Sequence, residues 1–528
     1  MSNPLRLGSA PLVSRAAEYT ELRRSRHPEL DTEACLTIAS HRGPVQFAAE
    51  GGQLRVRHNG GGLATSLRAL TGLTGAMRWI CAADTPQDHL VARAMSWNTA
   101  PLGEGECELR MLDLDAAAHN GCYAVIANPL LWFLQHGLYD ACRPPRFAEV
   151  ERRAWRDGYV AVNRAFAKAL TDRDDIPVGS TVMVHDYHLY LTPGMVRVAR
   201  PDVLIHFFGH IPWPDPATWS LLPRDVRDAI FRGLLGSDIV AFQTARDREN
   251  FLSGCTELLG LQVDSSRGTV DPEDGREVAV RNYPISVDPA SLRQVAASAV
   301  VADRARTLEP LRGTRVILRV DRADPAKNIT RGFEAYARLL VAHPELHERV
   351  SFLALIQPTR EAVPEYADYM RAIHRVVDDV NARFGTNTWK PIVLRLEEDP
   401  ALAIAAYKSF DVLFVNSIAD GMNLVAKEGL VVNETSGVLA LSRHTGAFAE
   451  VGGVAVPLDP LNVEQQARAL FRALSMPRNE RQRRLSRGRA IVGEQDLTRW
   501  FQRQLADLDA VRARRACLRT KAQRRFVA

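Results

Sequence analysis

Residues 411–428, DVLFVNSIADGMNLVAKE, join a strand, a turn and a helix in one short stretch. The apolar run DVLFV is too short for a buried helix and is typical of a strand that is covered on both faces. Gly421 permits a tight turn, and the backbone N–H groups at the following helix start suit a phosphate or a diphosphate. Glu428, inside that helix, can accept hydrogen bonds from a sugar diol. An ordinary helix cap at Asp420 beside a solvated Glu428 is the alternative interpretation.

The same pattern, a short apolar run followed by an amphipathic segment, recurs on both sides of this stretch. The other runs are residues 35–40, 78–83, 181–185, 203–208, 238–242, 314–320, 351–356, 391–396 and 437–441. Repeated strand–helix units predict an α/β fold with doubly wound parallel sheets. The runs break near residues 283–292, so we expect two Rossmann-like domains, residues 1–285 and 286–485, that face each other across a central cleft. Residues 486–528 are expected to form a C-terminal helix that packs back on the first domain, with a basic tail.

Composition and charge exclude several classes of protein. The 528 residues are 46% hydrophobic and 24% charged, which is ordinary for a globular chain. The net charge is +5, but the last 18 residues alone hold seven basic side chains and no acid, so the rest of the chain is slightly acidic and a poor match for nucleic acid. No apolar run reaches the about 18 residues that span a membrane. Seven cysteines without a CxxC pair, and no signal-peptide core, predict reduced thiols and a cytoplasmic location.

Ligands of open α/β sheets bind at the carboxyl ends of the strands, so the residues that follow each strand are candidates for the site. Arg322 and Lys327 follow the strand at 314–320 and can hold one phosphate group from two sides. An exposed charge pair beside Asp324 is the alternative. Asp186 and His210 also follow strands and can orient sugar hydroxyls.

Weaker signals come from a glycine run and two further arginines. Gly61 and Gly62 precede the helical segment LATSLRAL and form a candidate phosphate cradle. Arg42 and Arg360 each follow a strand and can meet a second anion. The sequence has no HExxH, no Ser-His-Asp pattern and no cysteine ligand set, which predicts neither a metal nor a covalent nucleophile, and we expect no cofactor. The absence of GxGxxG after the first strand disfavours a nicotinamide dehydrogenase.

Four of these pieces in this order carry a resemblance to a known family. HDYHL at 185–189, HIPWP at 210–214, DGMNLVAKE at 420–428 and the R-x-D-x-x-K loop at 322–327 resemble the trehalose-6-phosphate synthase family. Members of that family are retaining glucosyltransferases of the GT-B fold. The resemblance covers about residues 33–505. It implies transfer of glucose from UDP- or GDP-glucose to glucose 6-phosphate, which yields α,α-trehalose 6-phosphate.

The resemblance also implies roles for individual residues. Those implied for the donor diphosphate are Gly61, Gly62, Arg322, Lys327, Gly421 and the backbone of Met422, Asn423 and Leu424. Glu428 is implied for the nucleotide ribose, and His210 and Asp420 for the donor glucose. Those implied for glucose 6-phosphate are Arg42, Tyr123, Trp132, Asp186 and Arg360. Core packing of Tyr123 and Trp132 is the alternative for that pair.

The chain departs from the family pattern at a few positions. It has Ser40-His41-Arg42 where the family usually has SNR, and it lacks a phenylalanine in Leu396-Glu-Glu-Asp399, near the expected nucleotide base. Uracil and guanine therefore both remain candidates for the donor base. Glycerol 3-phosphate or a cyclitol phosphate is an alternative acceptor, and a non-catalytic sugar-phosphate sensor is a second alternative. The sequence leaves open whether the protein is a homo-oligomer.

Overall fold

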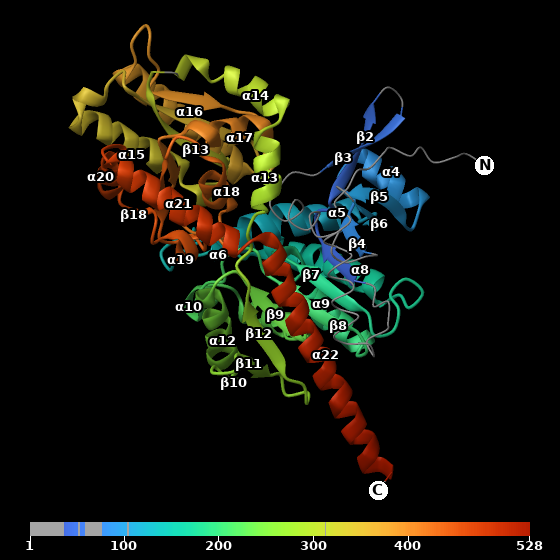
Figure 1. Ribbon diagram of the computed structural model, residues 1–528. Coiled ribbons are helices and arrows are strands. Elements are labelled where there is room, and N and C mark those ends of the chain that lie inside the picture. The colour runs from blue at the N-terminus through green and yellow to red at the C-terminus, as the bar shows by residue number, and fades with distance from the viewer. Residues whose placement is uncertain (1–35, 51–52, 59–76, 103–104, 312, 528) are drawn as a thin grey trace.

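The computed structural model describes residues 36–50, 53–58, 77–102, 105–311 and 313–527 (Figure 1). A ten-stranded sheet has the strand order β10-β11-β12-β9-β8-β7-β1-β4-β6-β5. Its strands are β1 (Leu36–Ser40), β4 (Met77–Ala82), β5 (Asn98–Leu102), β6 (Gly105–Leu112), β7 (Thr181–His185), β8 (Leu204–Phe208), β9 (Ile239–Phe242), β10 (Gln262–Asp264), β11 (Thr269–Asp271) and β12 (Val278–Asn282). Two further strands, β2 (Val45–Glu50) and β3 (Gln53–His58), form a separate antiparallel hairpin.

The strands between β12 and β6 are parallel, and helices lie against this sheet. The helices of this part are α4 (Pro86–Ala94), α5 (Ala116–Asn120), η1 (Gly121–Trp132), α6 (Phe133–Gln135), α7 (Glu149–Arg153), η2 (Ala154–Tyr159), α8 (Val160–Thr171), η3 (Tyr187–Leu189), α9 (Thr192–Ala199), α10 (Pro216–Trp219), α11 (Arg224–Leu234) and α12 (Ala245–Leu259). The antiparallel pairs β5–β6, β10–β11 and β11–β12 at the sheet edges were not expected from the sequence. Short connections allow such hairpins without a crossover helix.

A six-stranded sheet, order β15-β14-β13-β16-β17-β18, is parallel throughout. Its strands are β13 (Arg315–Arg322), β14 (Val350–Gln357), β15 (Ile392–Arg395), β16 (Val412–Val415), β17 (Val438–Ser442) and β18 (Val456–Leu458). The helices of this part are α13 (Pro289–Ala296), α14 (Ala299–Arg306), η4 (Glu309–Leu311), η5 (Pro325–Lys327), α15 (Ile329–Ala342), η6 (Pro344–Leu346), α16 (Pro364–Phe384), α17 (Pro400–Ser409), α18 (Leu424–Val432), α19 (Phe448–Val451), α20 (Val463–Leu474) and α21 (Arg478–Glu494). The loops after β13 and β16 leave the same edge of this sheet, because the two strands run parallel side by side.

The long C-terminal helix α22 (Leu497–Val527) runs from the second sheet back along the first (Figure 1). The indole of Trp500 donates to the carbonyl oxygen of Tyr283 over 3.1 Å, and Arg512 donates to the hydroxyl of Thr181 over 2.7 Å. Arg515 forms an ion pair with Asp238. Within the described residues, no helix is both long and apolar enough to cross a membrane. The division of the chain at residues 285 and 485 stays a prediction.

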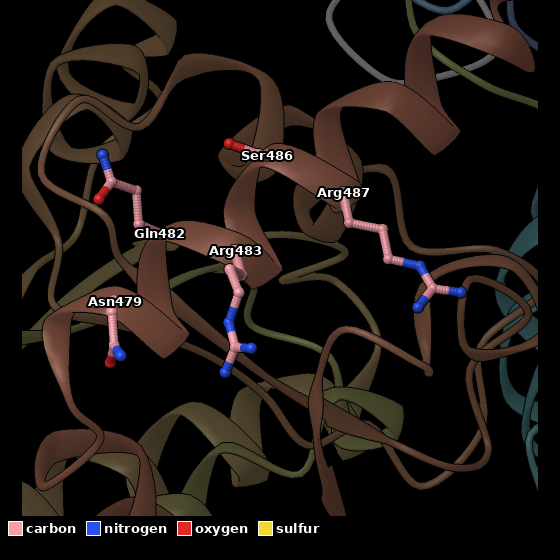
Figure 2. A pocket seen from close by; sticks show the side chains of 5 residues that line it. All are labelled: Asn479, Gln482, Arg483, Ser486 and Arg487. Atoms are coloured by element: carbon pink, nitrogen blue, oxygen red, sulfur yellow. The ribbon is translucent and has the colours of Figure 1, made fainter.

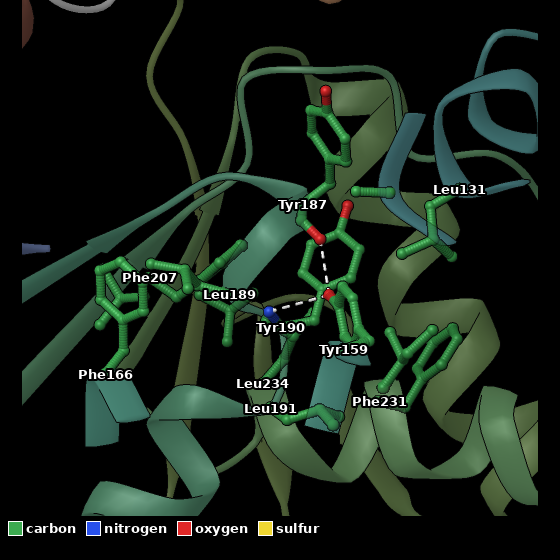
Figure 3. Close-up of a cluster of buried hydrophobic side chains, with 14 of the residues drawn as sticks. Leu131, Tyr159, Phe166, Tyr187, Leu189, Tyr190, Leu191, Phe207, Phe231 and Leu234 are labelled. Carbon is green, nitrogen blue, oxygen red and sulfur yellow. Dashed lines mark hydrogen bonds between the residues drawn. The ribbon is translucent and has the colours of Figure 1, made fainter. Parts of the chain in front are cut away.

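Tyrosines organise the buried layer under the first sheet (Figure 3). The hydroxyl of Tyr159 donates to the carbonyl oxygen of Tyr187 over 2.6 Å, and the backbone N–H of Tyr190 donates to the same hydroxyl over 3.3 Å. All three rings are at most 2% exposed. These bonds fix the short η3 turn directly after β7, and with it the position of Asp186.

Candidate active site

The loop after β13 presents one lysine and one arginine next to a buried carboxylate. Asp324 is fully buried and accepts from the backbone N–H of Ala326 over 3.0 Å, which starts the η5 turn that carries Lys327. The ammonium of Lys327 donates to the carboxylate of Asp420. The guanidinium carbon of Arg322 lies 5.4 Å from the centre of the Trp132 ring.

The neighbouring loop after β16 presents Asp420 to Lys327. Its carboxylate also accepts from the Ser417 hydroxyl over 3.2 Å and from the Asn423 amide over 3.0 Å. Burial disfavours the charged form of Asp420, but the ion pair with Lys327 and these hydrogen bonds hold its pKa below the ordinary value. Asn423, with a φ of 77°, caps α18 by accepting from the N–H of Ala426. The helix therefore begins where the sequence places an anion site.

Gly421 lies directly against the backbone of the first half of the chain. A Cβ atom at this position would lie 2.0 Å from the backbone oxygen of His210 and 3.0 Å from the Cα of Ile211. Only a residue without a side chain fits, so the DGMNL loop lies directly against the HIPWP loop. Met422 and Asn423 are buried behind it, and Leu424 is half-buried.

Asp186 and His210 lie together at the ends of β7 and β8. Asp186 has a φ of 73°, and its carboxylate accepts from the backbone N–H of His210 over 3.1 Å. Burial raises the pKa of Asp186 to about 6. Burial also lowers the pKa of His210 well below its ordinary value, so the imidazole is neutral at pH 7. Its Nε2 lies 3.1 Å from Nδ1 of His185, and Gln243 approaches its Nδ1 at 3.3 Å.

The helix η1 explains how Tyr123 and Trp132 meet on one side. It is wound as a π-helix, and a π-helix has about 4.4 residues per turn, so residues nine apart lie near the same face. An α-helix would place them on opposite faces. Both rings contact the η3 turn: Tyr123 lies 6.1 Å from His188, and Trp132 lies 5.4 Å from Tyr187, between ring centres. The indole N–H of Trp132 also donates to Asp324 of the other half over 3.2 Å.

Arg360 completes this side of the site. Its guanidinium carbon lies 4.2 Å from the centre of the Trp132 ring, and it donates to the Tyr187 hydroxyl over 3.0 Å. It also lies 3.4 Å from the carboxylate of Asp324 and donates to the hydroxyl of Tyr366. A buried cation thus faces an aromatic wall, which suits an anionic ligand with an apolar ring face.

Arg42 and Glu428 have partners of their own rather than one another or the residues above. The Arg42 side chain is 61% exposed and lies 3.7 Å from the Asp84 carboxylate. Glu428 accepts from the hydroxyl of Tyr407 over 3.1 Å, and burial raises its pKa. Gly61 and Gly62 lie outside the described residues.

Sequence reasoning missed a set of imidazoles around these residues. His41, His119 and His188 form a stack in which ring centres lie 4.5 to 5.1 Å apart, beside Tyr123. His136 stacks on Trp132 at 4.1 Å. The four-residue spacing of Trp132 and His136 was a usable signal, whereas the stack draws on three separate segments and leaves no local pattern.

Other features hold none of the predicted site residues. Figure 2 shows a groove along α21 lined by Asn479, Gln482, Arg483, Ser486 and Arg487. In the part of the chain that the structure describes, no group of three or more His, Cys, Asp or Glu side chains could hold a metal ion. The residues that do meet are a lysine, two arginines, a helix start and aromatic rings, an arrangement that can bind a diphosphate on one side and an anionic sugar on the other.

A model of glycosyltransferase family 20 matches residues 35–510. The chain is 33% identical to a bifunctional trehalose-6-phosphate synthase/phosphatase of Thermoproteus tenax over 483 residues, 88% of this chain but only 62% of that protein. It is 34% identical to a trehalose-6-phosphate synthase of Mycobacterium avium over 479 residues, 88% of this chain and 93% of that one.

Solved structures agree with this match. An α,α-trehalose-phosphate synthase of Burkholderia xenovorans in complex with glucose 6-phosphate has a TM-score of 0.77 at 26% identity, and the match covers 90% of this chain and all of that one. An Escherichia coli protein bound with UDP-2-fluoro glucose has the same TM-score and identity over 90% of this chain and 98% of that chain. These likenesses confirm the expected GT-B fold.

Proposed function

Because this chain belongs to glycosyltransferase family 20, we propose that it transfers glucose from a nucleoside-diphosphate glucose to glucose 6-phosphate and that the product is α,α-trehalose 6-phosphate. The observation that carries the proposal is the meeting of two sets of loops. In the second half, Lys327 donates to Asp420, and the adjacent Gly421 lies against the backbone of His210 in the first half. Asp324 of the second half accepts a hydrogen bond from Trp132 of the first. The groups proposed for the diphosphate thus lie next to the aromatic ring proposed for the sugar.

The leaving diphosphate gains negative charge as the glycosidic bond of the donor breaks. Arg322, Lys327 and the start of α18 stabilise that charge more in the transition state than in the ground state. For Gly61 and Gly62, which lie outside the described residues, the proposed role is to donate backbone N–H groups to the same diphosphate. His210 and Asp420 hold the donor glucose, and Glu428 holds the ribose through a hydrogen bond from a hydroxyl.

The acceptor is bound by the other set of residues. Arg360 and Arg42 hold its phosphate, while Tyr123 and Trp132 cover its ring. Asp186, largely ionised above pH 6, accepts a hydrogen bond from an acceptor hydroxyl. The attacking hydroxyl approaches the face that the diphosphate leaves, and an oxygen of that diphosphate takes its proton. Retention then requires no nucleophilic carboxylate, in contrast to the pair that retaining glycosidases use.

The relatives support the substrates in this assignment. The Burkholderia xenovorans structure is described in complex with glucose 6-phosphate, and the Escherichia coli structure with a fluorinated UDP-glucose. The chain spans about three fifths of the length of the Thermoproteus tenax relative, so the bifunctional activity of that protein as a whole is not part of the proposal. The six cysteines in the described residues are free thiols, in keeping with a cytoplasmic enzyme.

One assay tests the proposal directly. Purified protein is incubated with UDP-glucose and GDP-glucose in parallel, with glucose 6-phosphate, glycerol 3-phosphate and a cyclitol phosphate as acceptors. Release of nucleoside diphosphate measures turnover, and mass and NMR analysis of the product identify the new bond. We expect an α,α-1,1 linked phosphorylated disaccharide from glucose 6-phosphate. Faster transfer to another acceptor would replace the assigned substrate, and donor binding without turnover would identify a sensor.

A further inference from the structure

A fully buried arginine lies beneath the diphosphate side of the site. Arg319, in the middle of β13, is 0% exposed. One of its Nη atoms donates to the backbone oxygen of Lys327 over 3.0 Å and to the side-chain oxygen of Asn416. Its Nε lies 3.1 Å from the carboxylate of Asp321, which is 5% exposed. A single guanidinium thus touches the loops that carry Lys327 and Asp420.

Asn416 extends this contact to a third loop. Its amide nitrogen donates to the backbone oxygen of Asn328 over 3.1 Å and to the side-chain oxygen of Gln466 over 2.8 Å. The Asn328 amide donates back to the Asn416 carbonyl oxygen over 3.0 Å. Gln466 donates to the carbonyl oxygens of Asp459 and Pro460 over 3.1 and 3.0 Å. We call Arg319, Asn328, Asn416 and Gln466 the buried network; it joins the loops after β13, β16 and β18.

The position of the guanidinium leaves little freedom. A Cβ atom at Gly332 of α15 would lie 3.0 Å from its Nη1, and the Phe414 ring centre lies 5.6 Å from its Cζ. In the described part of the chain, Nη1 has no hydrogen-bond partner. A buried ion pair of this kind contributes little net stability, and apolar residues of similar volume are often as stable. Stability alone therefore gives no reason for a charge here.

We propose that Arg319 is a positioning residue for the transfer reaction, acting through the buried network to hold the Lys327 ammonium against Asp420. The inference rests on the proposed function, because it assumes that Lys327 contacts the leaving diphosphate. Without Arg319, the Lys327 carbonyl loses a donor and Asn416 loses its link to β13. The two loops can then separate, and the ammonium no longer has one fixed place.

A double-mutant cycle tests this inference with a readout that a structural role would not move. Arg319→Met is made in the native chain and in Lys327→Ala, and kcat is measured for all four proteins. We expect Arg319→Met to lower kcat at least tenfold in the native chain and less than threefold in Lys327→Ala. Arg319→Lys, which keeps the charge and loses the fork, should also lower kcat at least tenfold.

The matched control is Arg197 on α9, another buried arginine with a carboxylate partner. It is 9% exposed, donates to Asp238 over 2.7 Å and contacts none of the described residues that are proposed for the site. Arg197→Lys should lower the unfolding temperature by an amount similar to Arg319→Lys and change kcat less than twofold. Equal losses of kcat for Arg319→Met in both backgrounds would overturn the inference.

Two remaining outcomes are also decisive. If Arg319→Met does not fold, the cycle is run with Arg319→Lys, and additive losses count against the inference. If the native protein shows no transfer with any donor and acceptor, the proposed function fails. The cycle is then run on the affinity for UDP and GDP by calorimetry. Non-additive losses of affinity would retain the positioning role, and additive ones would exclude it.

Discussion

Replacing Lys327 by methionine tests the leaving-group site most directly. The side chain is 13% exposed, and its ammonium forms an ion pair with the carboxylate of Asp420, which is 13% exposed as well. An ammonium in such a place interacts strongly with a departing diphosphate, because little water screens it. Loss of one well-placed donor of this kind raises the barrier by about 3–4 kcal/mol, which corresponds to a fall in kcat of about 10²–10³.

The same substitution leaves Asp420 without its cation. Burial, which already disfavours the charged form, then acts with less opposition, so the pKa of Asp420 rises from its present low value. The free energy of unfolding falls by about 3 kcal/mol, at the lower end for a broken buried pair, because Ser417 and Asn423 still donate to the carboxylate. The substitution therefore lowers both the stability of the fold and the turnover number, so the two effects have to be measured separately.

The assay is nucleoside diphosphate release at saturating glucose 6-phosphate, with thermal unfolding measured on the same samples. Lys408→Met is the control, since Lys408 lies 3.3 Å from Glu434 and donates to the Ala296 carbonyl oxygen at a distance from the site. We expect it to keep kcat within about twofold. Near-native turnover of a folded Lys327→Met protein, or an equal loss in Lys408→Met, would refute the assignment of Lys327.

Arg42→Ala should raise the KM for glucose 6-phosphate at least tenfold and the KM for the donor less than twofold. Steady-state kinetics with each substrate varied in turn measure both values, and equal changes in the two KM values would exclude an acceptor role for Arg42. Glu428→Gln should weaken donor binding in calorimetry, and an unchanged dissociation constant would remove the ribose assignment. Gly421→Ala should lower kcat at least tenfold while the protein stays folded, because the added Cβ pushes the two loops apart; native turnover would contradict the contact with His210. Acceptor kcat/KM should fall as the pH drops through about 6, since protonation of Asp186 removes the negative charge that strengthens its hydrogen bond from the acceptor hydroxyl; a fall that persists in Asp186→Asn would assign the titration to another group.

Much of the fold could be predicted because its strands are short, apolar and separated by helices. Every apolar run that was predicted as a strand overlaps one in the structure, including β1, β7, β13 and β16. Three of the missed strands, β10, β11 and β18, are only three residues long. The others, β2, β3, β5, β6 and β12, have five to eight residues but contain charged or polar side chains or proline among the apolar ones. Three residues carry no periodicity, and the longer mixed runs lack a clear apolar stretch, so neighbours in the sheet decide their conformation.

Within the site, the sequence predicts the positions of residues that directly follow strands. It does not predict which polar side chains are buried beneath them. Lys327 and Asp420 follow β13 and β16, and the parallel register brings them together. Arg319 looks like a solvent-facing charge in a strand, since arginine is rarely buried. The imidazole of His41 gives no sign in the sequence that it stacks on His188. The π winding of η1 is not predictable from the spacing of its apolar residues.

That winding limits how the segment between Tyr123 and Trp132 can vary among related proteins. Each residue of a π-helix turns the chain by about 80°, so losing or gaining one residue there would swing one ring about a quarter of a turn away from the other. Substitutions leave this alignment intact, but a change in length destroys it. The side chains of Tyr123 and Trp132 can thus be exchanged by design, whereas insertions and deletions belong outside residues 121–132.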